Sequence, residues 1–186
     1  MKKIFVLASI TILSACNSKE PAKTDTVKIE SDSTMAINSP YPILYSSKFE
    51  MGDPKNAETV LQLWKVWDDG DLSKSKDMFA DTVQLYLADG SIMKGPRDSV
   101  MAGAQQYRNS LGSSSSVIHA VTDLKSTDKN ENWALVWGME KDTDKKGKVD
   151  SFFLQETWRF NKDGKADVLH QFKAAAAPPK MMPAKK

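Results

Sequence analysis

The chain has 186 residues, with 26 basic and 24 acidic side chains and a formal net charge of +2. Lys2 and Lys3 fall in a segment that we expect to be removed, which leaves 24 basic against 24 acidic side chains. A balanced charge without a basic stripe argues against a nucleic-acid partner. The single cysteine, Cys16, excludes an intramolecular disulfide and a metal site built from cysteines.

Residues 1–15 have the layout of a bacterial export signal. A basic start is followed by the apolar run Ile4–Leu13, which is shorter than the ~20 residues of a membrane-spanning helix. The run ends in Leu13-Ser14-Ala15-Cys16, which resembles the lipobox of bacterial lipoproteins. We therefore expect Cys16 to carry acyl chains that anchor the mature chain in a membrane of the cell envelope, the outer membrane rather than the inner. The alternative is an ordinary signal peptide with a chance cysteine.

Composition divides the rest of the chain into three parts. Residues 16–40 are rich in Lys, Glu, Asp, Ser and Thr, and such a stretch buries too little apolar surface to order itself, so we expect a flexible tether. Residues 176–186 are a low-complexity tail that we expect to be disordered. Between them, residues 41–175 are enough for one domain.

Two helices are predicted at the start of this domain. The first begins at Asp53-Pro54 and ends at Gly70, because Asp can accept from free first-turn amides and Gly suits the left-handed cap. Its apolar residues recur at helical spacing. Asp71 can cap a second, short helix that reaches Phe79.

A hairpin and a third helix follow. Val83, Leu85 and Leu87 alternate with polar residues, and Asp89-Gly90 is a tight-turn signal. Gly95-Pro96 then opens a helix that carries apolar residues as far as Leu111.

Long strands are predicted in the second half of the domain, after a linker at residues 112–116. They are Val117–Leu124, Trp133–Glu140, Ser151–Phe160 and Ala166–Lys173. Along the second of these strands, one face carries Trp133, Leu135, Trp137 and Met139. Helices first and antiparallel strands last predict an α+β fold.

Three short motifs accompany this order of elements: Trp67-Asp-Asp-Gly-Asp71, Met78-Phe-Ala-Asp81 and Trp158-Arg-Phe-Asn-Lys-Asp-Gly-Lys165. Together, order and motifs resemble the NTF2-like superfamily, and within it the SnoaL-like and ketosteroid-isomerase-like proteins, over about residues 50–173. The resemblance implies a cone with a pocket, in which three helices, one of them short, pack on a curved, mostly antiparallel sheet. It also implies that the outer face of the sheet can pair with a second copy as a homodimer.

The resemblance also bears on catalysis. Isomerase-like members use a carboxylate base, a tyrosine and a carboxylic acid. At the matching positions this chain has Leu87, Leu63 and Glu156. Because neither leucine can move a proton, the resemblance argues against isomerase-type proton transfer and leaves only Glu156 as a candidate catalytic residue.

Glu156 also stands out from the residue pattern. It shares a strand face with Phe152, Leu154, Trp158 and Phe160. A carboxyl buried among such side chains loses hydration, which raises its pKa and makes it a candidate acid–base group. The alternative is that Glu156 lies near a sheet edge, or pairs across the strands, and serves only folding.

The aromatic residues suggest the walls of a pocket. If the cone is open, Trp67, Trp137 and Trp158, together with Leu87, are suited to contact an apolar or ring-shaped ligand. The alternative is that the tryptophans fill the core.

The two histidines predict no metal site. His119 and His170 have no third nitrogen or sulfur ligand for a zinc ion, and we expect neither a metal nor a cofactor. Strand alternation turns His170 inward, whereas the resemblance places Leu169 and Gln171 inside.

These observations leave three hypotheses for function. The first is a non-catalytic, lipid-anchored domain that binds a small apolar or amphipathic molecule or a protein partner. The second is a SnoaL-like isomerase or hydrolase that uses Glu156 as acid or base. The third is a structural dimer module. Two polar residues facing Glu156 across a cavity favour the enzyme, and a cavity filled by tryptophans favours the structural module.

Overall fold

The computed structural model describes residues 37–175. The predicted signal, Cys16, residues 16–36 of the tether and the tail lie outside the described residues. Helix α1 spans Pro54–Asp69, the 3-10 helix η1 spans Leu72–Met78, and helix α2 spans Arg97–Ser110. None of the helices within residues 37–175 is long and apolar enough to cross a membrane.

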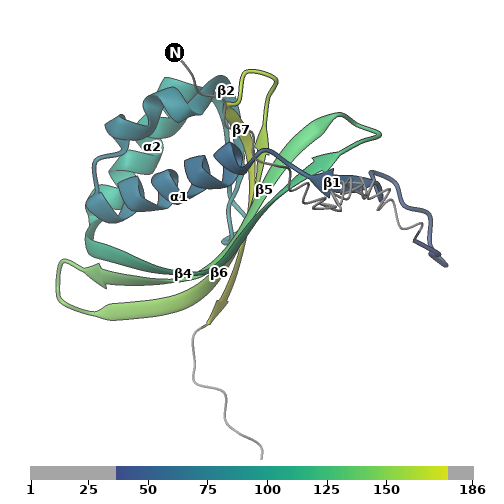
Figure 1. The fold of residues 1–186 in the computed structure, drawn as a ribbon. Coiled ribbons are helices and arrows are strands. Elements are labelled where there is room, and N and C mark those ends of the chain that lie inside the picture. Colours follow the sequence, from purple (N-terminus) through teal and green to yellow (C-terminus); the bar gives the residue numbers. More distant parts are fainter. Residues whose placement is uncertain (1–36, 176–186) are drawn as a thin grey trace, which may run out of the picture. The chain divides into compact units, whose positions relative to one another are not determined.

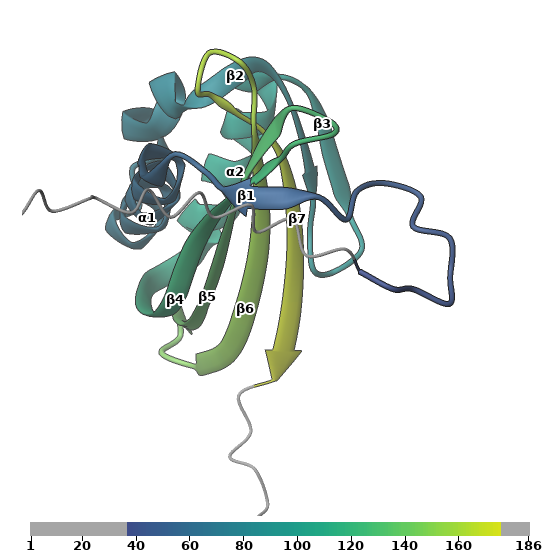
Figure 2. The same cartoon turned by 45° about the vertical axis from the view of Figure 1, so that its right-hand side comes forward.

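Within the described part of the chain, seven strands form one sheet in the order β1-β4-β5-β6-β7-β2-β3. Only the β2–β7 pair is parallel, so the sheet is mostly antiparallel and the predicted α+β class is confirmed. The sheet curves around the helices, which lie on its concave side (Figures 1 and 2). The strands are β1 (Phe49–Met51), β2 (Phe79–Tyr86), β3 (Ile92–Pro96), β4 (Leu111–Ser126), β5 (Glu131–Asp144), β6 (Val149–Phe160) and β7 (Ala166–Ala175).

The predicted helix ends are confirmed for α1 and η1. The Asp53 carboxylate accepts from the backbone N–H of Lys55 at 3.0 Å, and Gly70 ends α1 with a φ of 84°. Asp71 caps η1 through the N–H of Ser73. Helix α2 begins just after the predicted Gly95-Pro96, but it stops at Ser110 because the chain becomes extended there and starts β4.

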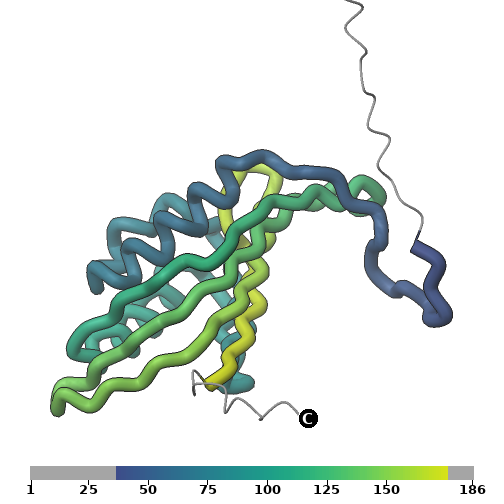
Figure 3. The backbone as a smooth tube through the Cα atoms, turned by 60° about the horizontal axis from the view of Figure 1, so that its bottom comes forward, coloured from purple at the N-terminus to yellow at the C-terminus, as the bar shows by residue number. Residues whose placement is uncertain are grey.

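One prediction about the strands is wrong, and one short strand was not predicted. Residues 112–116 are not a linker but the first part of β4, paired with the end of β5. The short strand β1 was not predicted, since three residues are too few to show a period. Figure 3 shows the long strands β4, β5 and β6 side by side along the whole bend of the sheet.

The core lies between α1 and the inner face of the sheet. Val60 and Trp64 of α1 pack in one cluster with Ala134 and Val136 of β5. A Cβ at Gly138 would lie 2.7 Å from the Trp64 ring. The helix therefore requires small residues on the part of β5 that it crosses, and the bulky residues of that strand lie on the opposite side.

Candidate functional site

A cavity of about 420 Å³ lies between the helices and the concave face of the sheet. Most of its wall is apolar, with Leu63, Leu85, Leu87, Met93, Phe152 and Leu154 among the lining residues. Four of the predicted site residues line it: Trp67, Leu87, Glu156 and Trp158. The cone is therefore open, and the tryptophans do not fill it.

The fifth predicted wall residue, Trp137, does not line this cavity. It lies on the outer face of the sheet, 38% exposed, in a shallow hollow with Phe153 and Phe172. The prediction treated the Trp-rich face of β5 as the inner one. It is the outer face, because α1 packs too closely on β5 for a large side chain.

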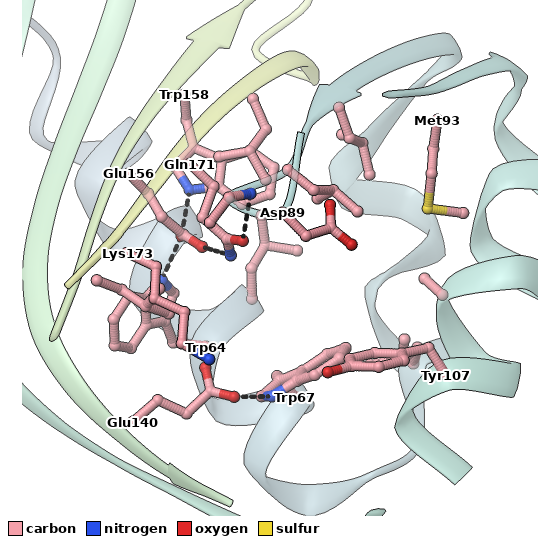
Figure 4. A pocket seen from close by; sticks show the side chains of 18 of the residues that line it. Trp64, Trp67, Asp89, Met93, Tyr107, Glu140, Glu156, Trp158, Gln171 and Lys173 are labelled. Carbon is pink, nitrogen blue, oxygen red and sulfur yellow. Dashed lines mark hydrogen bonds between the residues drawn. The ribbon is translucent and has the colours of Figure 1, made fainter. Parts of the chain in front are cut away.

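Glu156 is buried, with 5% of its surface exposed, and it accepts three hydrogen bonds (Figure 4). The donors are Trp64 Nε1 at 2.7 Å, Trp158 Nε1 at 2.8 Å and Gln171 Nε2 at 2.8 Å. The amide oxygen of Gln171 accepts from the backbone N–H of Ala88 at 3.3 Å, which fixes the amide so that its NH₂ group faces Glu156.

These bonds shape the chemistry of Glu156. Burial raises its pKa, and the hydrogen bonds from Gln171, Trp158 and Trp64 oppose that rise. Each partner is an N–H donor, so the site is built for an acceptor carboxylate. Glu156 therefore connects α1, β6 and β7 through its hydrogen bonds. This geometry fits the alternative stated in the sequence analysis, in which Glu156 pairs across the strands and serves folding.

A buried pair of acidic residues was missed by the sequence analysis. Glu140 and Asp142 of β5 also line the cavity and are 8% and 7% exposed. Trp67 Nε1 donates to Glu140 Oε1 at 2.9 Å. Burial, then the neighbouring Asp142, raise the pKa of Glu140 to about 8. The sequence does contain a pattern from which the pair could have been found. Every second residue of β5 from Ala134 onward is small or medium-sized, and the same strand face then reaches Glu140 and Asp142.

Trp67 is held in place from several sides. Its ring stacks on Tyr107 of α2, with centroids 6.1 Å apart and planes at 26°. The buried Arg108 donates from Nε to the Trp67 carbonyl at 2.6 Å, and its guanidinium lies 5.9 Å from the centre of the Trp67 ring. The indole is thereby positioned to support Glu140.

The histidines lie away from the cavity. His170 stacks on Tyr86, with centroids 4.6 Å apart, while Leu169 and Gln171 line the cavity. The resemblance was therefore right about this strand, and simple alternation was wrong. Within residues 37–175, no group of three or more His, Cys, Asp or Glu side chains is arranged to hold a metal ion.

Comparison with known proteins gives matches in structure only. No protein-family model matches the sequence, and no curated protein matches it. An LEH-like epoxide hydrolase of M. tuberculosis has a TM-score of 0.54 at 9% identity, over 64% of this chain and 83% of its own. The epoxide hydrolase/cyclase-like enzyme SalBIII, from pyran ring formation in the polyether salinomycin, has a TM-score of 0.52 at 15% identity, over 64% and 91%.

A further similar structure is an NTF2-like protein of unknown function from Burkholderia pseudomallei. It has a TM-score of 0.52 at 17% identity, over 64% of this chain and 90% of its own. At such identities the likeness concerns the fold alone. The sheet order, the helices on the concave face and these matches together identify the domain as one with the NTF2-like fold.

Proposed function

We propose that the domain is a non-catalytic binding domain that holds a small amphipathic molecule in its cavity. The observation that carries this proposal is the open cavity of about 420 Å³, with apolar walls and a few polar groups. Small-molecule sites have this composition and a volume of ~300–1,000 Å³. Leu63 and Leu87 line the cavity where isomerase-like enzymes of similar fold have proton-moving groups, which supports binding rather than that chemistry.

A neutral fluorescent probe, N-phenyl-1-naphthylamine, tests this proposal. We expect saturable binding of one probe per chain, and we expect Ala104→Trp to abolish it because Ala104 lines the cavity. The matched control is Ala120→Trp, at an exposed position opposite Trp137 on the outer face. Loss of binding in the control alone, or no binding by the wild type, contradicts the proposal.

A second candidate is an enzyme, favoured by the acidic pair. Glu140 holds a proton at neutral pH beside Asp142, and both line the cavity. In epoxide opening, Glu140 would protonate the leaving oxygen while Asp142 takes a proton from the attacking water. Glu156 is less suited to this role, because its oxygens are occupied by three donors.

Epoxide turnover distinguishes this candidate. The enzyme hypothesis expects diol formation from styrene oxide or limonene oxide, lost in Glu140→Gln and retained in the outer-face variant Trp137→Phe. Absence of diol above the uncatalysed rate leaves the binding function.

We further propose that Cys16 anchors the chain in the cell envelope. The support is the lipobox-like sequence before it and its standing as the only cysteine. Cys16→Ser removes the thiol that would be acylated, so we expect an unprocessed or soluble precursor on fractionation. A variant that still matured and stayed in the membrane fraction would contradict the anchor.

A further inference from the structure

The lining of the cavity has an excess of acidic groups. Asp89, Glu140, Asp142 and Glu156 all line it, whereas Lys173 is the one basic side chain among the lining residues. Lys173 already has partners outside the acidic pair. Its Nζ lies 3.6 Å from the carboxylate of Asp150 and 3.4 Å from the centre of the Phe152 ring.

Among residues 37–175, no basic side chain forms an ion pair with the acidic pair on β5. Trp67 donates a hydrogen bond to Glu140, and a hydrogen bond between the Glu140 and Asp142 side chains contributes to the raised pKa of Glu140. The buried Asp142 Oδ1 has no hydrogen-bond partner among the described residues. Ser114, opposite Asp142 on β4, has a buried hydroxyl without a partner as well. Because buried carboxyls are normally paired and hydrogen-bonded, two acids without a basic partner on residues that line a cavity are candidate contacts for a positively charged ligand. Glu156 differs, since its three donors already satisfy it.

An aromatic surface lies beside the pair. Figure 4 shows Glu140, Trp67 and Tyr107 along the same part of the cavity, with Trp67 and Tyr107 stacked. Burial raises the pKa of Tyr107, and the charges of Asp142, Glu140, Asp89 and Asp150 raise it further. The phenol therefore lies in a negative potential. Aromatic faces next to carboxylates attract ammonium groups.

We propose that the cavity binds an organic cation, whose ammonium group contacts Glu140 and Asp142 beside the Trp67–Tyr107 stack while its apolar body lies on the leucine and methionine side chains of the wall. This inference rests on the proposed binding function and narrows its ligand from amphipathic molecules in general to organic amines. Two carboxyl groups and two aromatic rings are enough to bind an ammonium group, because an ammonium group, unlike a metal ion, does not need a fixed number of ligands.

Three compounds with one body and different head groups test the inference. 4-Phenylbutylamine, 4-phenylbutanol and 4-phenylbutyrate compete for the cavity against N-phenyl-1-naphthylamine. We expect the amine to bind at least ~10-fold more tightly than the alcohol, and the butyrate to bind most weakly, because only the amine carries a charge opposite to that of the two acids and can donate charge-assisted hydrogen bonds to them. Lys173→Met should tighten amine binding further by removing the one positive charge from the lining.

The double variant Glu140→Gln/Asp142→Asn should remove the preference for the amine while the alcohol still binds. The control Glu50→Gln/Asp81→Asn makes the same two kinds of substitution at side chains that are 52% and 96% exposed. A second measurement needs only the wild type. Because the amine remains charged to about pH 10, its affinity should rise between pH 7 and 9 as Glu140 loses its proton. Glu140 titrates in the field of Asp142 and Glu156, and the other charged groups of the lining are Asp89 and Lys173.

The outcomes separate the two proposals. If the alcohol and butyrate compete as well as the amine, and amine affinity does not change with pH, the inference is overturned and the ligand cavity stands. The inference is also overturned if the probe binds but none of the three compounds displaces it. If neither the probe nor any compound binds, both proposals fail.

Discussion

At the scale of single residues, Glu156 connects three elements through one carboxylate. Trp64 belongs to α1, Trp158 to β6 and Gln171 to β7, and each donates to it. Loss of a partner from a buried polar group costs about 1–3 kcal/mol, more than a surface bond would. The Glu156 carboxylate thus stabilises the cavity wall, and Glu156 also lines the cavity.

Glu156→Gln should destabilise the domain by about 1–3 kcal/mol. The new amide would turn its NH₂ group toward the NH₂ group of Gln171, and two donors cannot bond to each other. Adding Gln171→Glu restores a donor–acceptor pair, so the double variant should recover part of the loss. Urea unfolding measures both. Equal stability of the single variant and the wild type would contradict the hydrogen-bond arrangement.

Glu140 should make stability depend on pH. Its pKa is raised from 4.5 to about 8 in the folded domain, so the unfolded chain loses this proton first as pH rises. The contribution of Glu140 to the free energy of unfolding therefore falls as pH rises from about 4.5 to about 8. Glu140→Gln should flatten that fall, and the exposed control Glu50→Gln should leave it unchanged. Parallel pH profiles for Glu140→Gln and the wild type would show that Glu140 titrates normally.

At the scale of elements, the close contact between α1 and β5 sets the inner wall. The Trp64 ring lies over Gly138, where a Cβ would also meet the carbonyl oxygen of Val117 at 2.8 Å. The contact explains why the less hydrophobic face of β5 is the buried one. It also turns Glu140 and Asp142 into the cavity, since they share that face.

Gly138→Ala should destabilise the domain by about 1–3 kcal/mol, the usual cost of an overpacked core. The displaced Trp64 should also lose its hydrogen bond to Glu156, which lies 2.7 Å away. In a Trp64→Phe background the cost should be smaller, because the shorter ring leaves room for the new methyl group. A double-mutant cycle measures this coupling. If the changes in the free energy of unfolding caused by Gly138→Ala and Trp64→Phe were purely additive, the cost of Gly138→Ala would not come from a clash with the Trp64 ring.

The elements themselves were largely predictable from the sequence. Caps such as Asp53 and Gly70 act through local bonds, so their residue types fix the helix ends. The α+β order followed from changes in apolar period. The side on which Trp137 lies was not predictable in this way, because both faces of β5 carry apolar residues and the choice depends on the distance to α1. Trp67, Glu156 and Trp158 line the cavity, and each lies on a helix or strand face that is mostly apolar in the sequence.

At the scale of the whole molecule, the outer face of the sheet supports a proposal of self-association. Trp137, Phe153 and Phe172 are 38%, 42% and 59% exposed there. The open cavity makes a purely structural module a weaker hypothesis, yet a homodimer and a ligand site are compatible. We expect a dimer by sedimentation and a monomer for Phe153→Lys, because a charge at an apolar interface would be buried unpaired. Identical sedimentation of the two proteins would contradict a dimer through this face.

The central claim is that a ligand enters the cavity, and the five tryptophans report on it directly. With 5-fluorotryptophan in place of tryptophan, ¹⁹F NMR gives one signal for each, assigned by single Trp→Phe variants. Trp64, Trp67 and Trp158 line the cavity, whereas Trp133 and Trp137 do not. Titration with 4-phenylbutylamine should shift the Trp67 signal most and leave the signals of Trp133 and Trp137 unchanged. A shift confined to Trp137, or no shift in any signal at saturating amine, would contradict the account.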